Sequence, residues 1–145
     1  MAETARILIV DDDVSFAESN RDLLEAYGYE VRIADDGTSG LALAREFRPD
    51  IVILDVMMAT MTEGFDVARQ IHDLPELRHT RILLVTGMTA ELNLPGQLAP
   101  DATWLPVDRI LDKPIAPQRL ISDVERLLRQ KDDSGAEKNR SHAAG

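Results

Sequence analysis

The chain has 145 residues, 44% of them hydrophobic and 29% charged, a composition typical of a single globular domain. No apolar run reaches the ~20 residues that a membrane-spanning helix needs, no signal-peptide pattern opens the chain, and the lack of cysteine excludes disulfides and thiolate metal sites. Together these absences lead us to expect a cytoplasmic protein with no membrane contact. The formal net charge of −10 disfavours non-specific nucleic-acid binding, so no direct contact with nucleic acid is expected.

Strand-like apolar runs alternate with helical patterns along the chain, which is typical of βαβ units and a parallel sheet. The predicted strands are residues 6–10, 30–34, 51–54, 81–85 and 110–112. The third run is apolar at every position, as expected of a strand that is buried on both faces. The pattern therefore predicts an α/β fold.

Helices are predicted between these strands and after the last one. Their apolar positions at helical spacing are, in chain order, Phe16, Leu23, Leu24 and Tyr27; Leu41, Ala44 and Phe47; Phe65, Val67, Ala68, Ile71 and Leu74; and Leu120, Ile121, Val124, Leu127 and Leu128. Gly28 is the predicted C-cap of the first helix, Asp36 and Gly37 turn the chain into the second, and Pro117 opens the last. Three prolines between residues 89 and 107 predict an irregular fourth crossover with at most a short helix.

Polar residues stand where four of the apolar runs end. Asp11 and Asp12 follow the first strand, Asp55 the third, Thr86 the fourth and Lys113 the fifth. Because the carboxyl ends of parallel strands open onto one crevice, we expect these side chains to lie together. Three carboxylates, a hydroxyl and an ammonium group suit a divalent cation together with a phosphoryl group.

These residue types predict a particular chemistry. Magnesium prefers hard oxygen ligands and often sits between carboxylates and phosphate, so the acidic residues predict a Mg²⁺ site. Asp55 is the candidate nucleophile toward phosphorus, and Thr86 and Lys113 would contact the phosphoryl oxygens. The alternative interpretation is that each polar residue only caps a strand or a helix.

Four motifs in this order, ILIVDDD, DIVILDVMM, ILLVTG and ILDKP, resemble those of the receiver domain of bacterial two-component response regulators. The resemblance covers residues 4–130, and residues 131–145 are predicted to form a flexible charged tail. It implies a CheY-like, flavodoxin-like (βα)5 fold, a doubly wound parallel sheet with strand order 2-1-3-4-5 and helices on both faces.

The resemblance also assigns roles to the acidic residues. Asp55 would accept a phosphoryl group from the phosphohistidine of a sensor histidine kinase or a phosphotransfer protein. Asp12 would bind Mg²⁺ directly, Asp11 mainly through water, and the backbone carbonyl of Met57 would complete the protein ligands.

By the same resemblance, Thr86 and Lys113 contact the phosphoryl group, and the bond between Lys113 and Pro114 is cis. Asp13 falls outside the metal pair and is predicted to cap the first helix, whose N-terminal amides favour a negatively charged acceptor. No enzymatic activity is expected beyond phosphotransfer to the chain itself and slow autodephosphorylation.

The chain departs from the family pattern at four places. Ala59 stands where the family commonly has proline, and the loop from Asp55 to Gly64 is one residue longer than usual. Ile110 replaces the usual Tyr or Phe, and the spacing from Thr86 to Lys113 is several residues longer than typical. These departures affect the path by which phosphorylation would change the output surface of the protein. They leave open the alternative interpretation that the chain is an atypical receiver acting as a constitutive protein-binding module.

We expect a single-domain receiver that signals through contacts with an unknown downstream protein, because residues 131–145 are too few to form an effector domain. Another interpretation is a phosphatase of the haloacid-dehalogenase type, since residues 11–15 resemble the DxDx(T/V) motif of that family and Asp11 would then be the nucleophile. The short chain and the lack of an acidic pair after Lys113 speak against it.

Overall fold

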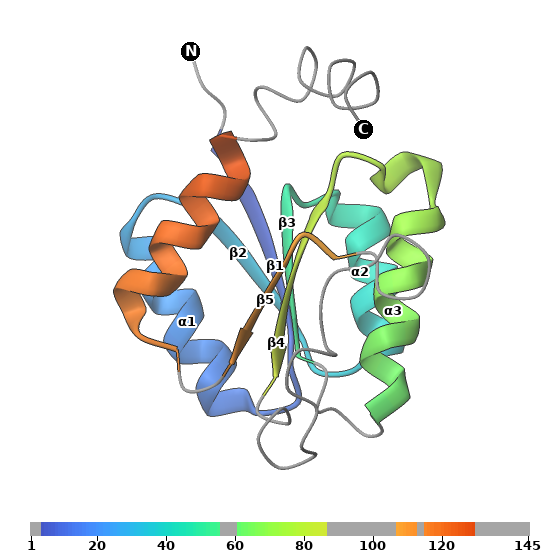
Figure 1. Ribbon diagram of the computed structural model, residues 1–145, viewed down its shortest axis with the longest axis horizontal. Coiled ribbons are helices and arrows are strands. Elements are labelled where there is room, and N and C mark those ends of the chain that lie inside the picture. Colours follow the sequence, from blue (N-terminus) through green and yellow to red (C-terminus); the bar gives the residue numbers. More distant parts are fainter. Residues whose placement is uncertain (1–3, 56–60, 87–106, 113–114, 130–145) are drawn as a thin grey trace.

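The computed structural model describes residues 4–55, 61–86, 107–112 and 115–129 (Figure 1). The strands are β1 (Arg6–Val10), β2 (Glu30–Ala34), β3 (Ile51–Asp55), β4 (Arg81–Thr86) and β5 (Arg109–Asp112). The helices are α1 (Val14–Ala26), α2 (Gly37–Phe47), α3 (Met61–Asp73), a short 3-10 helix η1 (Pro75–Leu77) and a C-terminal helix at residues 117–129. All strands form one parallel sheet in the order β2-β1-β3-β4-β5, which confirms the predicted fold class.

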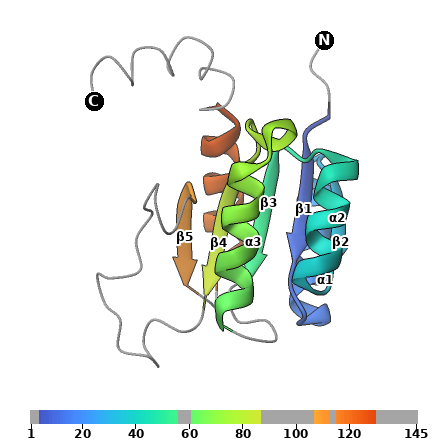
Figure 2. The same ribbon diagram turned by 90° about the vertical axis from the view of Figure 1, so that its right-hand side faces the viewer.

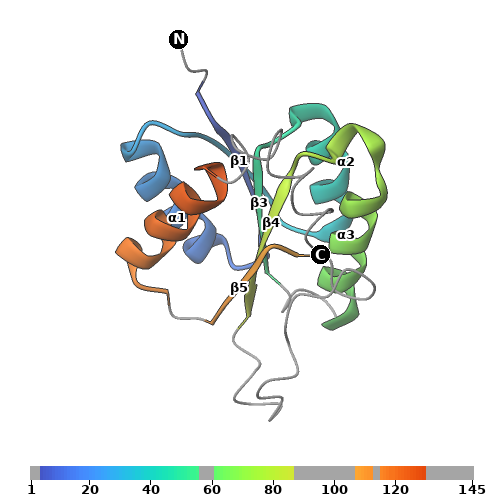
Figure 3. The same ribbon diagram turned by 45° about the horizontal axis from the view of Figure 1, so that its top comes forward.

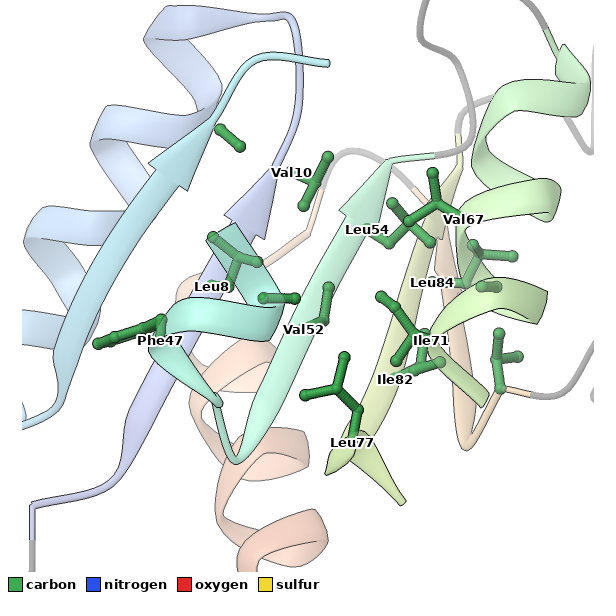
Figure 4. Packing of buried hydrophobic residues seen from close by; sticks show 14 residues of the cluster. Leu8, Val10, Phe47, Val52, Leu54, Val67, Ile71, Leu77, Ile82 and Leu84 are labelled. Carbon is green, nitrogen blue, oxygen red and sulfur yellow. The ribbon is translucent and has the colours of Figure 1, made fainter. Parts of the chain in front are cut away.

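Helices cover both faces of the sheet, so the protein has two hydrophobic cores (Figures 1 and 3). α1 and the C-terminal helix pack on one face, and α2 and α3 pack on the other. Successive side chains of a strand enter opposite cores: Ile7 and Ile9 of β1 join the α1 side, and Leu8 and Val10 join the α2 side (Figure 4). Burial on both faces explains why the central strands are apolar at nearly every position.

Asp13 and Gly28 define the two ends of α1, as predicted. The Asp13 side chain accepts a hydrogen bond from the backbone N–H three residues later (3.1 Å), which caps the helix N-terminus. At the other end Gly28 has φ +95°, and Tyr29 N donates to Leu24 O at 3.2 Å, the pattern of a Schellman motif. Tyr27, the last of the apolar residues at helical spacing, does not share the buried face of α1, because the helix ends at this residue and its side chain is exposed.

α2 is capped by an aspartate and packs against β1 through a glycine. Asp36 Oδ1 accepts hydrogen bonds from the backbone N–H (2.7 Å) and the hydroxyl (2.8 Å) of Ser39. These bonds stabilise the carboxylate and lower the pKa of Asp36. Further along, a Cβ atom added to Gly40 would lie 2.9 Å from both Cγ atoms of Val10. No side chain larger than hydrogen therefore fits there without a shift of α2 or β1.

Two aspartates bind backbone groups where the strands begin. Asp50 Oδ2 accepts from Arg6 N at 2.8 Å, and its carbonyl accepts from Arg81 N at 2.9 Å. Asp108 Oδ2 accepts from Ile82 N at 2.8 Å. These bonds join the amino ends of β1, β3, β4 and β5, and thereby help to fix the register of the sheet.

A buried ionic cluster attaches the C-terminal helix to β5. The Asp123 side chain is 2% exposed and accepts hydrogen bonds from Arg109 Nε (3.0 Å) and Arg119 Nε (2.9 Å). The two arginine side chains keep 33% and 55% of their surface exposed, so water still solvates part of each guanidinium. The negative charge of the Asp123 carboxylate is thereby balanced by the two arginines, and neither guanidinium is fully desolvated.

Two predicted features lie outside the described residues: the proline-rich part of the fourth crossover at residues 89–106 and the charged tail at residues 131–145. Ile110, at the family's aromatic position, is half-buried against the α2-side core. Of the helices within the described ranges, none combines the length and the apolarity that crossing a membrane requires.

Candidate functional site

Three acidic side chains gather at the carboxyl edge of the sheet, the edge to which the strand arrows point in Figure 2. Asp11 and Asp12 follow β1, and Asp55 is the last residue of β3. Because Val10 of β1 lies opposite Leu54 of β3, the residues that follow them lie side by side. One carboxylate oxygen from each of the three acidic residues lies within 4.8 Å of the other two.

The backbone around Asp11 holds its side chain in place. Asp11 N donates to Ala34 O at 3.0 Å, which ties the end of β1 to the end of β2. Asp11 Oδ1 accepts from Asp13 N at 2.8 Å, an Asx-turn geometry. This turn was not among the predicted features, although an aspartate two residues before a helix cap is a signal for it. Asp11 and Asp55 are buried and Asp12 is exposed, so the site opens to solvent at Asp12.

Thr86 lies at the same edge of the sheet. It is the last residue of β4 and is fully buried. In the strand register Val85 is opposite Asp55, and Thr86 is opposite Asp112 of β5. Thr86 therefore lies one residue beyond Val85, the residue of β4 that is opposite Asp55.

The remaining predicted site residues lie elsewhere or outside the described residues. Asp13 caps α1 and is not in the acidic cluster, in line with its predicted role. Lys113, with the predicted cis bond to Pro114, and Met57, whose carbonyl is a predicted metal ligand, are outside the described residues.

The acidic cluster fits the predicted cation. Its donors are three carboxylates, and Mg²⁺ takes hard oxygen ligands, usually one or two carboxylates together with water and phosphate. Carboxylates this close repel one another in the absence of a cation. Asp11, Asp12 and Asp55 therefore form a site that favours a small divalent cation.

The fold and this site agree with the relatives of the chain. Residues 7–125 match the family described as the response regulator receiver domain, so the chain belongs to the receiver domains of two-component response regulators. The matched region contains all three residues of the acidic cluster and, apart from Arg6 at the start of β1, all five strands.

Individual relatives show the same family. The DNA-binding response regulator MtrA of Mycolicibacterium paratuberculosis is 36% identical over 132 residues, which is 91% of this chain but 55% of that regulator. The chain thus spans about half the length of this relative. Among solved structures, CheY4 of Vibrio cholerae has a TM-score of 0.72 at 31% identity, over 86% of this chain and 99% of that one. A CheY-like receiver protein from Methanospirillum hungatei has a TM-score of 0.74 at 26% identity, over 91% and 99%.

Proposed function

We propose that this chain is a phosphorylation-dependent switch in which Asp55 accepts a phosphoryl group from a sensor histidine kinase or a phosphotransfer protein. The observation that carries the proposal is the cluster of Asp11, Asp12 and Asp55 at the carboxyl edge of a receiver fold. The family match supports it. The output would pass through contacts with a downstream protein, and the chain would catalyse no reaction other than its own phosphorylation and slow dephosphorylation.

The reaction moves a phosphoryl group from nitrogen to oxygen. A carboxylate oxygen of Asp55 attacks phosphorus and forms a P–O bond, while the P–N bond to the donor histidine breaks. The electron pair of that bond stays on the imidazole nitrogen, which then takes up a proton. The product is an acyl phosphate on Asp55, a side chain that is 2% exposed in the described structure.

Charge is the main obstacle to this reaction, because the incoming phosphoryl group is anionic and meets three carboxylates. Asp11, Asp12 and Asp55, together with the backbone carbonyl of Met57, would hold Mg²⁺. When bound, the cation neutralises charge on the carboxylates and the phosphoryl oxygens.

Two further residues would recognise the phosphoryl group. Thr86, at the end of β4, would donate its hydroxyl to one phosphoryl oxygen, and Lys113 would contribute its ammonium. A movement of Thr86 toward the new anion would be the first structural consequence of phosphorylation.

Incubation with acetyl phosphate and MgCl₂, followed by intact-mass measurement, tests the proposal. We expect one added phosphoryl group that hydroxylamine removes, as an acyl phosphate requires. Asp55→Asn should abolish the addition, and Asp12→Ala or EDTA should suppress it strongly.

Asp13→Asn is a matched control. It removes a negative charge next to Asp12 but keeps a side-chain oxygen that can cap α1, so phosphorylation should continue at close to the parent rate. Full labelling of Asp55→Asn would exclude Asp55 as the nucleophile. A greater loss in Asp13→Asn than in Asp12→Ala would mean that the acidic run is misassigned.

A further inference from the structure

β2 lies at one edge of the sheet, and within the described residues it pairs with β1 alone. The N–H of Glu30 and the carbonyl of Ala34 form hydrogen bonds of 2.9 and 3.0 Å to the residues that flank β1. Since successive residues of a strand direct their backbone groups to opposite sides, those of Val31 and Ile33 face the outer edge. Each of these two residues presents a donor and an acceptor in the geometry that an added strand requires.

A groove of about 570 Å³ lies along the carboxyl half of this edge. Its apolar lining comes from α1, β2 and α2 and includes Val14, Ile33, Ala42 and Leu43. Val14 is 55% exposed, although it is a large hydrophobic residue next to a buried core. The charged residues of the lining, Asp35 and Glu46, are both acidic. The groove thus offers apolar contacts and negative charge beside strand positions whose outer side pairs with no other strand in the described part of the chain.

Charged side chains often protect an edge strand from unwanted pairing, but those of β2 are engaged elsewhere. Glu30 lies 4.0 Å from Arg6 Nε, and the Arg32 guanidinium lies 4.8 Å from the centre of the Phe47 ring. Glu30 opens the strand and Arg32 is its middle residue, whereas the residues of β2 that line the groove, Ile33 and Ala34, are its last two. Within the described residues, no strand pairs with the outer edge at this end of β2.

We propose that the outer edge of β2 is a docking site for an extended segment of a partner protein that carries apolar and basic residues. The segment adds to the sheet as a further strand and forms hydrogen bonds with the backbone groups of Val31 and Ile33. Its apolar side chains fill the groove against α2 and Val14, and its basic side chains face Asp35 and Glu46. The site uses none of the acidic cluster, so it is independent of the phosphorylation proposed above.

A fluorescein-labelled peptide, Lys-Val-Lys-Val-Lys-Val-Lys, is the probe, with binding followed by fluorescence anisotropy and amide hydrogen exchange followed by NMR. On binding, the amides of Val31 and Ile33 should exchange about tenfold more slowly or better, because they gain hydrogen bonds. The amide of Arg32, which already faces β1, should not change. A peptide with N-methylated valines, which cannot donate at those positions, should bind about tenfold more weakly or worse.

Two matched variants locate the site. Ala42→Arg places bulk and positive charge in the groove and should weaken binding about tenfold or more. Gln70→Arg adds the same side chain at an exposed position of α3 and should leave the affinity unchanged. All binding measurements are made without a phosphoryl donor and are repeated in the Asp55→Asn variant. A failure of the docking proposal can therefore be distinguished from a failure of the phosphorylation proposal.

Several outcomes would overturn the docking proposal. These are equal binding of the N-methylated peptide, full binding by Ala42→Arg, or binding that leaves the Val31 and Ile33 amides unprotected. Protection of these amides in the protein alone would also overturn it. If protection of these amides from exchange, measured without peptide, rises with protein concentration, the edge is covered by a second copy of the chain. If that protection does not change with concentration, the edge is covered by another part of the same chain.

Discussion

Gly40→Ala tests how closely α2 must pack on β1, the strand that leads into the acidic cluster. The new Cβ would lie 2.9 Å from two carbon atoms of Val10, a fully buried residue, whereas carbon atoms pack best at about 3.5–4.0 Å. Overpacking in a core costs about 1–3 kcal/mol, and alanine in place of glycine within a helix contributes about 1 kcal/mol of stability. The net effect should be a loss of about 1 kcal/mol in the free energy of unfolding.

Urea unfolding followed by circular dichroism measures this loss, and a second substitution tests its cause. In a Val10→Ala background the steric conflict is absent, so Gly40→Ala should raise the free energy of unfolding by about 1 kcal/mol. Ala42→Gly, at an exposed position of α2, measures the effect of helix propensity alone. If Gly40→Ala stabilised the parent protein as much as it stabilised the Val10→Ala variant, the packing argument would be refuted.

Three further predictions concern buried charge, the pH dependence of stability and the acidic cluster. Asp123→Ala removes a buried carboxylate with two charge-assisted hydrogen bonds and should lower the free energy of unfolding by about 2–3 kcal/mol; an effect as small as that of an exposed residue would contradict this. Because the pKa of Asp36 is lowered in the folded protein, its carboxylate stabilises the fold at pH values above the ordinary pKa of 3.8. This stabilisation is lost as the pH falls through the lowered pKa. Asp36→Asn should therefore lose less stability in acid than the parent protein. In magnesium-free buffer, Asp12→Asn and Asp55→Asn should unfold at the same or higher urea concentration than the parent protein, since each relieves repulsion between carboxylates; clear destabilisation of both would count against the cluster.

Local patterns were sufficient to predict most of the fold. Each predicted strand agrees with the structure to within one residue at either end. For β1, β3 and β4 the reason is that a buried strand must be apolar, so the next polar residue marks its end. The local patterns also predicted that Asp11 and Asp55 lie at one edge of the sheet, since parallel strands bring their carboxyl ends together. That β1 and β3 are neighbours came from the resemblance to receiver domains.

The errors and omissions concern contacts that local patterns do not encode. Tyr27 has helical spacing, but the left-handed backbone at Gly28 ends the helix and leaves the ring in solvent. Asp123 looks like an exposed residue of the last helix, since lone aspartates are rarely buried. Its burial depends in part on Arg109 of β5, the preceding strand, which the helical pattern alone does not place next to it.

The hydrogen bonds of Asp50 and Asp108 have a consequence for engineering. They fix the strands at the amino ends, so part of the strand alignment is set away from the connections at the opposite edge. We therefore expect β1 and β3 to stay aligned when those connections are exchanged for ones of different length or composition. A chimaera that carries a foreign connection after β3 would keep Asp11 and Asp55 opposite each other, which makes this chain a scaffold for grafting new specificity loops.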